Sequence, residues 1–440
     1  MIYICGLLRD VHKAVFATQL IHNQQFTKKM PFSSHRGNTT PLSPFRKFAI
    51  LAEKAKAQGK QVYHLNIGQP DIPTPPEALQ TLQQVSITTL EYSPAEGIPS
   101  YREKLRRYYQ QYQVALSADQ IIVTTGASEG LYFVLLACLE AGEEVIVPEP
   151  FYANYNGFAH MAGVLLRPVT SYLEDGFALP EAAAFERVIN HRTRAILLCN
   201  PNNPTGCLYP RAALEALVAL ARKHNLFLVV DEVYREFCFD NQEFTSILAI
   251  PGAEEHAIVI DSVSKRYSAC GARIGALVTK NESVLAAVSR FAKLRLGSPT
   301  LEQYLAEAML DVDATYLQRV KAEYDLRRRT VYARLRQMPG VHCYLPGGAF
   351  YSFARFPIDD ADRFCQWLLE DFEYQNATVM LSPGAAFYAT PGLGQDEVRL
   401  AYVINVPQLE AAMDCLARAL EVYPGRVEAV ASMTAASNML

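Results

Sequence analysis

The sequence predicts an α/β protein in which a large, mostly parallel sheet is followed by a smaller α+β domain. Short and fully apolar runs, such as residues 226–230 and 257–260, alternate with stretches of helical character. A strand with no polar side must be buried on both faces, so this pattern is typical of a parallel sheet covered by helices on two sides. After residue 300 the pattern changes to long, charged helices, which indicates a second domain.

The elements expected in the large domain begin with a strand over residues 120–124 and a helix over 128–139. Further strands are predicted at 144–147, 163–169, 194–199, 226–230, 257–260 and 273–278, and helices at 182–190 and 210–225. In the smaller domain we expect helices over 314–337 and 362–372, with strands at 342–344, 349–353, 378–381 and 398–403.

The chain divides on this basis into five segments. Residues 1–40 form an N-terminal extension, 41–84 an N-terminal segment packing with the small domain, 85–305 the large domain, 306–424 the small domain, and 425–440 a tail. The extension carries five Lys or Arg residues and a single acid, Asp10. It suits either a basic leader that is poor in acids or an extension outside the folded core. The second is favoured because Ser and Arg are not enriched.

Composition narrows the class of function. The chain has 440 residues, half of them hydrophobic, and a formal net charge of −4, so no basic excess points to nucleic acid. Its apolar runs are too short to span a membrane. Nine cysteines without a C-x-x-C pair predict reduced thiols and a cytoplasmic protein. The histidines lack metal-ligand spacing, so no metal is expected.

Lys265 gives the strongest indication of chemistry. It follows the expected strand at 257–260, with Ser262 and Ser264 before it and Arg273 eight residues after it. Ligands of open α/β sheets bind at the carboxyl ends of the strands. Hydroxyls and a guanidinium suit a phosphate, and a lysine that forms a Schiff base suits an aldehyde. The set predicts a site for pyridoxal 5′-phosphate (PLP); the alternative is an exposed lysine beside turn serines.

Two further motifs follow strands. In L-C-N-P-N-N-P-T-G, two Asn-Pro pairs hold Asn203 at the sheet edge, where its amide can donate to a phenolate or a carboxylate; the alternative is an ordinary Pro-rich loop. In V-V-D-E-V-Y, Asp231 ends a buried strand and would be satisfied by a protonated pyridine nitrogen, with Tyr234 reaching the 3-oxygen of the same ring. A cap on a following helix is the alternative for Asp231.

A turn and an aromatic residue complete the set. T-T-G-A-S-E-G reads as a strand, a glycine turn and a helix start, so the N–H groups of Ala127 and Ser128 would point at an anion. Ser128 is alternatively a simple N-cap. In P-E-P-F-Y, Tyr152 suits stacking on a flat ring, although an aromatic residue there is alternatively part of the core.

These motifs make the chain resemble the class I/II aminotransferases, PLP enzymes of fold type I, and most closely their bacterial aspartate-aminotransferase-like branch. The resemblance covers residues 41–422. It rests on N-I-G-Q-P-D, Y-S-P-A-E-G-I-P, N-P-N-N-P-T-G, D-E-V-Y, S-x-S-K with the later arginine, and R-L-A-Y-V, which occur in the family's order.

The resemblance implies a role for each site residue. Lys265 would be the covalent anchor and the proton shuttle, while Arg399, with Asn203 and Gly68, would hold the substrate α-carboxylate. Tyr92 would reach the phosphate of a neighbouring subunit, which implies a homodimer with composite sites. The other residues would hold the cofactor: Asp231 its pyridine nitrogen, Tyr234 and Asn203 its 3-oxygen, Tyr152 its ring in place of the family's frequent tryptophan, and Ala127, Ser128, Ser262, Ser264 and Arg273 its phosphate.

The activity implied is transfer of an amino group between an L-amino acid, aspartate-like, and a 2-oxo acid such as 2-oxoglutarate. A PLP lyase or decarboxylase of the same fold is an alternative. A PLP-binding regulator is another, although residues 1–40 are too few for a winged helix and a linker. Arg295 suits either a distal substrate carboxylate across the dimer or a solvated helix end. For Arg399, a salt bridge to Glu397 is the structural alternative.

Overall fold

The computed structural model describes residues 31–41, 43 and 47–427, and the chain divides into two units, Met1–Thr40 and Pro41–Leu440. In the first unit the described part contains α2 (His35–Thr39), which Ser34 caps by accepting a hydrogen bond from the N–H of Gly37 at 3.1 Å. Residues 1–30 of the predicted extension, and residues 428–440 of the predicted tail, lie outside the described residues.

The second unit is built around a seven-stranded sheet with the order β2-β8-β7-β6-β5-β3-β4. β8 runs antiparallel to both of its neighbours, and the other neighbouring pairs are parallel. The mostly parallel sheet expected from the sequence is therefore confirmed. Its strands are β2 (Ile121–Thr124), β3 (Glu144–Glu149), β4 (Leu165–Thr170), β5 (Thr193–Cys199), β6 (Phe227–Asp231), β7 (Ala257–Ser262) and β8 (Gly275–Thr279).

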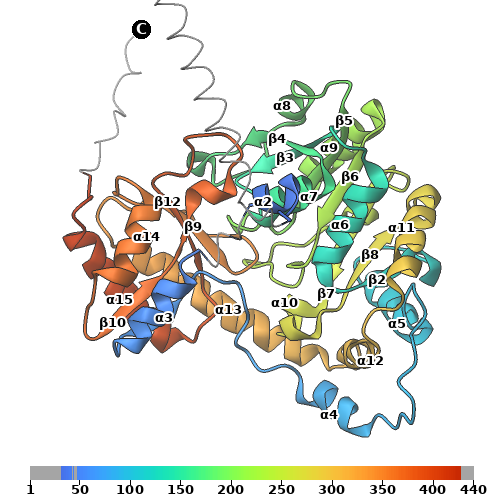
Figure 1. Ribbon diagram of the computed structural model, residues 1–440, viewed down its shortest axis with the longest axis horizontal. Coiled ribbons are helices and arrows are strands. Elements are labelled where there is room, and N and C mark those ends of the chain that lie inside the picture. Colours follow the sequence, from blue (N-terminus) through green and yellow to red (C-terminus); the bar gives the residue numbers. More distant parts are fainter. Residues whose placement is uncertain (1–30, 42, 44–46, 428–440) are drawn as a thin grey trace, which may run out of the picture. The chain divides into compact units, whose positions relative to one another are not determined.

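Successive residues of each strand face two different hydrophobic cores. In β6, Val229 packs with α6, α7 and α11, whereas Leu228 and Val230 pack on the other face with α5 and α9. Figure 1 shows α6 and α9 on either side of the strands. The sheet is thus buried on both faces, which explains why its strands are apolar throughout. The helices of this part are α5 (Pro99–Gln110), α6 (Gly126–Cys138), α7 (Asn154–Ala162), α8 (Ala182–Glu186), α9 (Arg211–His224), α10 (Val263–Arg266), α11 (Glu282–Arg295) and α12 (Thr300–Met309).

The remaining strands form two small sheets. A three-stranded sheet has the order β11-β12-β9, and β1 pairs in parallel with β10. Residues before the large sheet therefore pair with residues near the end of the chain. The strands are β1 (Gln61–His64), β9 (Tyr351–Arg355), β10 (Ala377–Met380), β11 (Ser382–Pro383) and β12 (Glu397–Ala401); the helices are α3 (Ala49–Ala57), α4 (Pro76–Gln84), α13 (Ala314–Leu335), α14 (Ala361–Glu370) and α15 (Val406–Val422).

Two predicted elements are corrected by the structure. The strand expected at 342–344 is a single β-bridge between His342 and Arg355, because Pro346 follows closely and has no N–H to continue a ladder. The helix expected over 182–190 ends at Glu186, since the Asn190 side chain donates to Glu144 and its N–H to Thr193, at 2.8 and 2.9 Å, in a turn.

Two strand starts are also later than predicted. The strand expected from residue 163 begins at Leu165, because Gly163 is the left-handed cap of α7 with φ 77°. The strand expected from residue 273 begins at Gly275, because Arg273 has φ 54°, which does not fit a strand. Among the described residues, no helix is long and apolar enough to cross a membrane.

Candidate active site

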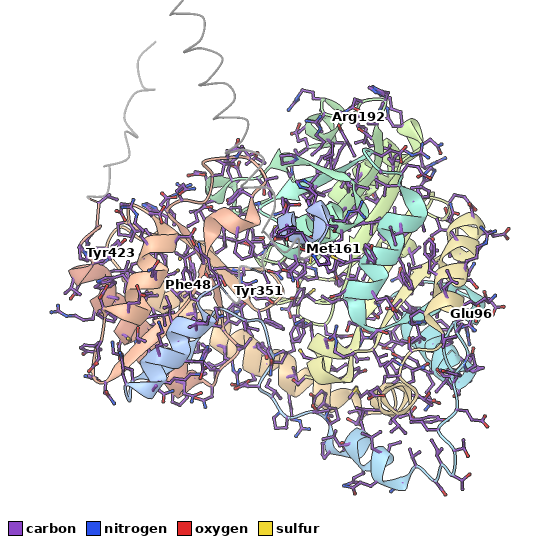
Figure 2. The ribbon with its side chains drawn as sticks, in the orientation of Figure 1. Phe48, Glu96, Met161, Arg192, Tyr351 and Tyr423 are labelled. Atoms are coloured by element: carbon purple, nitrogen blue, oxygen red, sulfur yellow. The ribbon has the colours of Figure 1, made fainter. Side chains whose placement is uncertain are left out.

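A cavity of about 540 Å³ lies at the carboxyl ends of β5 and β6, beside α10 and the small sheets. Every site residue expected from the sequence lines it, except Ser262 and Tyr92. Figure 2 labels Tyr351, a further lining residue, between the two groups of strands. The lining residues are Ser43, Ile67, Gly68, Gln69, Ala127, Ser128, Leu131, Tyr152, Asn154, Cys199, Asn203, Asp231, Val233, Tyr234, Ser264, Lys265, Cys270, Gly271, Arg273, Tyr351 and Arg399.

Lys265 reaches this cavity from α10, the short helix that follows β7. Its Nζ donates a hydrogen bond to the carbonyl of Gly68 at 2.8 Å and lies 3.9 Å from Sγ of Cys270. Burial lowers the pKa of Lys265, because it disfavours the charged ammonium. The amine is thus held in place and is more easily deprotonated than an exposed lysine, so the reading as an exposed lysine is wrong.

Asp231 ends β6 and is 5% exposed. Its carboxylate accepts two long hydrogen bonds, from the N–H of Val233 at 3.3 Å and from Tyr155 Oη at 3.4 Å. Burial raises the pKa of Asp231 to about 7, since these contacts only partly replace water. A turn follows β6 rather than a helix, so the reading as a helix cap is wrong. A cation in the cavity would satisfy this group.

Asn203 connects two other groups of the site. Its Nδ2 lies 3.5 Å from Tyr234 Oη, and its Oδ1 accepts from Arg399 Nη1 at 3.0 Å. Tyr234 Oη also shares a 2.8 Å hydrogen bond with Tyr351 Oη. The loop that carries Asn203 is buried and is held by Asn202, which accepts from Thr205 N–H at 3.1 Å. This loop therefore forms part of the site and is not an ordinary surface loop.

The start of α6 forms one end of the cavity. Thr125 is the N-cap of this helix, so Ser128 lies in the first turn and the reading as an N-cap is wrong. The first N–H groups of a helix have no partner within it and favour an anion. The guanidinium of Arg273 lies against Gly126, where a Cβ would approach Nη2 to 2.5 Å. The site therefore needs glycine at this position to keep helix start and guanidinium together.

The two serines beside Lys265 have different positions. Ser264 lines the cavity, and its Oγ lies 2.7 Å from Ser262 Oγ. Ser262 is the N-cap of α10 and donates to the carbonyl of Ile274 at 2.9 Å. Ser262 therefore lies behind Ser264 and orients it, rather than lining the cavity itself.

Arg399 comes from β12 and is fully buried. It donates to Asn203 and to the carbonyl of Asn66, and its guanidinium lies 4.6 Å from the ring centroid of Tyr351. Burial lowers the pKa of Arg399 because it disfavours the charged form. Glu397, the acid suggested as its partner, instead accepts from Tyr388 Oη at 2.6 Å and lies 3.7 Å from Arg355.

Tyr152 lines the cavity, and its partly buried ring also packs against the second hydrophobic core. Its Oη accepts a hydrogen bond from Asn154 Nδ2 at 2.8 Å, and its ring meets the edge of Tyr155 at 5.4 Å. Tyr92, in contrast, is 81% exposed and does not line the cavity. Arg295 pairs with Glu129 at 2.5 Å and its side chain is 16% exposed, so the expectation of a solvated helix end is wrong.

The residues missed from the sequence are Tyr155, Cys270 and Tyr351. Tyr155 lies in the first turn of α7 and Tyr152 just before that helix, and the sequence offers only the nearness of the two tyrosines as a signal. Cys270 lies within the motif that contains Lys265, but a lone cysteine carries no functional pattern. Tyr351 had no signal of its own, because its place depends on how β9 packs beside the large sheet.

These groups fit PLP. The buried carboxylate of Asp231 suits a cationic pyridine nitrogen, the start of α6 with Arg273 suits a phosphate, and Lys265 suits the aldehyde. The fit rests on charge and on donor type at three separate parts of one cavity.

Comparison with known proteins agrees with this fit. Residues 60–416 match the family model described as aminotransferase class I and II. The aspartate aminotransferase of Thermotoga maritima is 36% identical over 380 residues, which cover 84% of this chain and 95% of that protein.

Solved structures show the same fold. A crystal structure of aspartate aminotransferase from Thermotoga maritima aligns with a TM-score of 0.80 and 32% identity, over 88% of this chain and 100% of that one. An alanine aminotransferase from Pyrococcus furiosus gives a TM-score of 0.81 at 27% identity, over 88% of this chain and 99% of that one. The chain belongs to the class I and II aminotransferases. It is a transaminase of fold type I, and its cofactor is PLP.

Proposed function

We propose that this transaminase moves an amino group between an aspartate-like L-amino acid and a 2-oxo acid such as 2-oxoglutarate. The observation that carries the proposal is the placement of Lys265, Asp231 and Arg399 around one cavity. The aspartate-like donor is inferred from relatives named aspartate aminotransferase. An alanine aminotransferase among the structural neighbours makes alanine the comparison substrate.

The cofactor would be held at three points. Asp231 would face the pyridine nitrogen, Tyr234 and Asn203 the 3-oxygen, and Tyr152 the ring. The phosphate would lie at the start of α6, with these groups around it: the N–H groups of Ala127 and Ser128, the hydroxyl of Ser264 oriented by Ser262, and the guanidinium of Arg273. When bound, PLP withdraws electrons from the substrate's α-carbon and makes its proton acidic.

Lys265 would move that proton. Its Nζ is held by the carbonyl of Gly68, and its lowered pKa leaves the amine available as a base. In the second half of the reaction the same Nζ would return a proton to the α-carbon of the product amino acid. Lys265→Ala is expected to abolish turnover yet bind the cofactor, because the phosphate groups are on other residues. Near-normal turnover of this variant would contradict the assignment.

Arg399 would bind the substrate α-carboxylate, with Asn203 and Gly68 beside it. The hydrogen bond to Asn203 orients the guanidinium of Arg399, and the Tyr351 ring below it restricts rotation of the guanidinium. Because every amino acid has an α-carboxylate, this contact sets reaction geometry rather than side-chain choice.

A half-reaction screen tests the proposed function. The PLP-loaded enzyme is mixed with single amino acids, and the visible absorbance of the cofactor is followed together with the keto acid formed. We expect aspartate and glutamate to react fastest, with oxaloacetate and 2-oxoglutarate as products. Release of carbon dioxide, or of free ammonia with the cofactor left in its aldehyde form, would favour the lyase or decarboxylase alternative.

We also propose a homodimer in which Tyr92 of each subunit reaches the phosphate of the other. Two exposed apolar segments support it: Leu90 with Tyr92, and Leu294 with Leu296. The hydrogen bond from Ser93 Oγ to the carbonyl of Ser298, 2.9 Å long, ties the two segments together. Apolar side chains exposed in one place are typical of a protein interface.

We also propose a cellular location and a set of domain boundaries. The cytoplasm is the proposed location, because the described cysteines form no disulfide and the sequence contains no C-x-x-C pair. The proposed domain boundaries are those at residues 84/85, 305/306 and 424/425. Limited proteolysis that cuts first near these positions would support them, and early cuts inside 85–305 would contradict them.

A further inference from the structure

The guanidinium of Arg295, at the end of α11, donates all of its hydrogen bonds to groups of its own chain. Its Nη1 donates to Glu129 at 2.5 Å and to Ser298 Oγ at 2.8 Å. Its Nη2 donates to the carbonyls of Ala95 and Val123, at 2.8 and 3.4 Å, and its Nε to the carbonyl of Leu296 at 3.0 Å. These contacts use all five N–H donors of an arginine, so no donor is left for a substrate.

Glu129, the partner of Arg295, lies in the first turn of α6. The same Oε2 that accepts from Arg295 also accepts from the N–H of Thr125, the N-cap of the helix, at 2.8 Å. This contact fixes the turn that leads into Gly126, Ala127 and Ser128. Neither Glu129 nor Arg295 lines the cavity, and their side chains are only 17% and 16% exposed.

The negative charge of Glu129 lies close to the proposed phosphate site, and Arg295 compensates it. The N–H groups of Ala127 and Ser128 are the proposed contacts of a doubly charged phosphate. A carboxylate one or two residues further along the same turn would repel that phosphate, and a half-buried pair is screened less than an exposed one. The guanidinium of Arg295 cancels this charge while the carboxylate keeps its contact with Thr125.

We propose that Arg295 is a positioning residue for the cofactor phosphate. By neutralising Glu129 it lets the carboxylate hold the start of α6 without opposing the binding of the anion. The inference rests on the phosphate site proposed above. It replaces the role expected for Arg295 at a distal substrate carboxylate.

The test is a double-mutant cycle read as cofactor affinity. The dissociation constant of PLP is measured by equilibrium titration of cofactor-free enzyme for the wild type, Arg295→Met, Glu129→Gln and the double variant. Arg295→Met is expected to weaken PLP binding by on the order of tenfold, because the charge of Glu129 is then uncompensated. Glu129→Gln alone is expected to leave affinity unchanged or higher. The double variant is expected to regain most of the loss.

Two results would overturn the inference. If the double variant binds PLP no better than Arg295→Met, the arginine acts only through its contacts to Ser298 and Ala95. If Arg295→Met keeps wild-type affinity for PLP and raises KM for aspartate and glutamate but not for alanine, the residue serves a distal carboxylate after all.

Controls separate this inference from general destabilisation. Arg167→Met removes a guanidinium from the buried Glu144, which begins β3, next to the edge strand β4 and far from β2 in the strand order, so it is expected to lower Tm without changing PLP affinity. Arg295→Lys keeps the charge and is expected to bind PLP within about threefold of wild type, which keeps the test usable if Arg295→Met does not fold. Retained affinity in Arg295→Met overturns the inference.

The proposed phosphate site is tested by a separate variant. Arg273→Gln removes a cation that lines the cavity, so it is expected to weaken PLP binding whatever Arg295 does. Unchanged affinity in Arg273→Gln would contradict the phosphate site itself. Weakened affinity in Arg273→Gln, with no effect in Arg295→Met, would contradict only the role of Arg295.

Discussion

Asp231 is placed to bind a cation, and its burial lowers the stability of the protein when no cation is bound. Its carboxylate is buried with two long hydrogen bonds, and burial raises its pKa to about 7. Below about pH 7 the group therefore favours the neutral form until a cation arrives. The position would be costly in a protein without such a partner, which is why it indicates function and not only packing.

The raised pKa predicts how stability depends on pH. Between about pH 4 and 7 the folded protein holds a proton on Asp231 that the unfolded chain has lost, so this group's contribution to stability falls as pH rises. Without cofactor, Asp231→Asn is expected to exceed the wild type in unfolding free energy by about 1–3 kcal/mol at pH 8, and by much less near pH 4.5. Urea unfolding at the two pH values measures the difference.

The same substitution is expected to impair catalysis. A neutral amide does not keep the pyridine nitrogen protonated, so turnover should fall by at least about a hundredfold. If the stability difference between Asp231→Asn and the wild type is the same at both pH values, or if the variant keeps wild-type turnover, this account of Asp231 is wrong.

Arg399 makes a prediction about all substrates together. The α-carboxylate is common to them, and truncating one side of a desolvated charge pair costs about 2–5 kcal/mol, or thirty- to several-thousand-fold in kcat/KM. Arg399→Lys keeps a charge but loses the fork, so part of this loss is expected for aspartate, glutamate and alanine alike. Steady-state kinetics with the three substrates checks it. A lowered Tm with unchanged kcat/KM would show a purely structural arginine.

The elements predicted from sequence are those whose pattern is local. Strands β5, β6 and β7 are short and apolar, and the polar residues that follow them lie in the cavity because parallel strands end at one edge. Asn203, Asp231 and Lys265 were found in this way. The glycine turn at 126 likewise predicted an anion site at the start of α6, and in the structure Arg273 lies against Gly126.

What sequence did not reveal depends on contacts between distant segments. Tyr351 reaches Tyr234 only because β9 packs beside the large sheet. Arg295 was read as a solvated helix end or as a substrate contact, since nothing local shows that Glu129, 166 residues earlier, receives it. The strand expected at 342–344 is limited to one β-bridge for a local reason, the proline at 346, which has no N–H to continue a ladder.

At the scale of the whole molecule, Tyr92 is 81% exposed and lies outside the cavity of its own chain. The other proposed contacts of the cofactor line the cavity or, like Ser262, are buried behind it. Its segment is nevertheless well anchored. Ser93 donates to the carbonyl of Ser298, and Gln303 donates to Ser93 Oγ at 3.0 Å. An anchored segment that presents an exposed tyrosine is suited to contact a second copy of the chain.

The composite site predicts that cofactor affinity depends on assembly. Tyr92→Phe removes one hydroxyl donor to the phosphate, and a hydrogen bond to a charged group contributes about 1.5–3 kcal/mol, so PLP binding is expected to weaken by roughly ten- to a hundredfold. The dimer should persist, because the ring and its apolar neighbours are kept. Sedimentation velocity on the wild type and on Tyr92→Phe, each with a PLP titration, measures both quantities.

Tyr172→Phe is the matched control, since Tyr172 is also exposed and lies outside the cavity. A wild-type monomer with full activity at assay concentration would contradict the dimer, and a dimer in which Tyr92→Phe binds PLP as tightly as wild type would contradict the shared site alone.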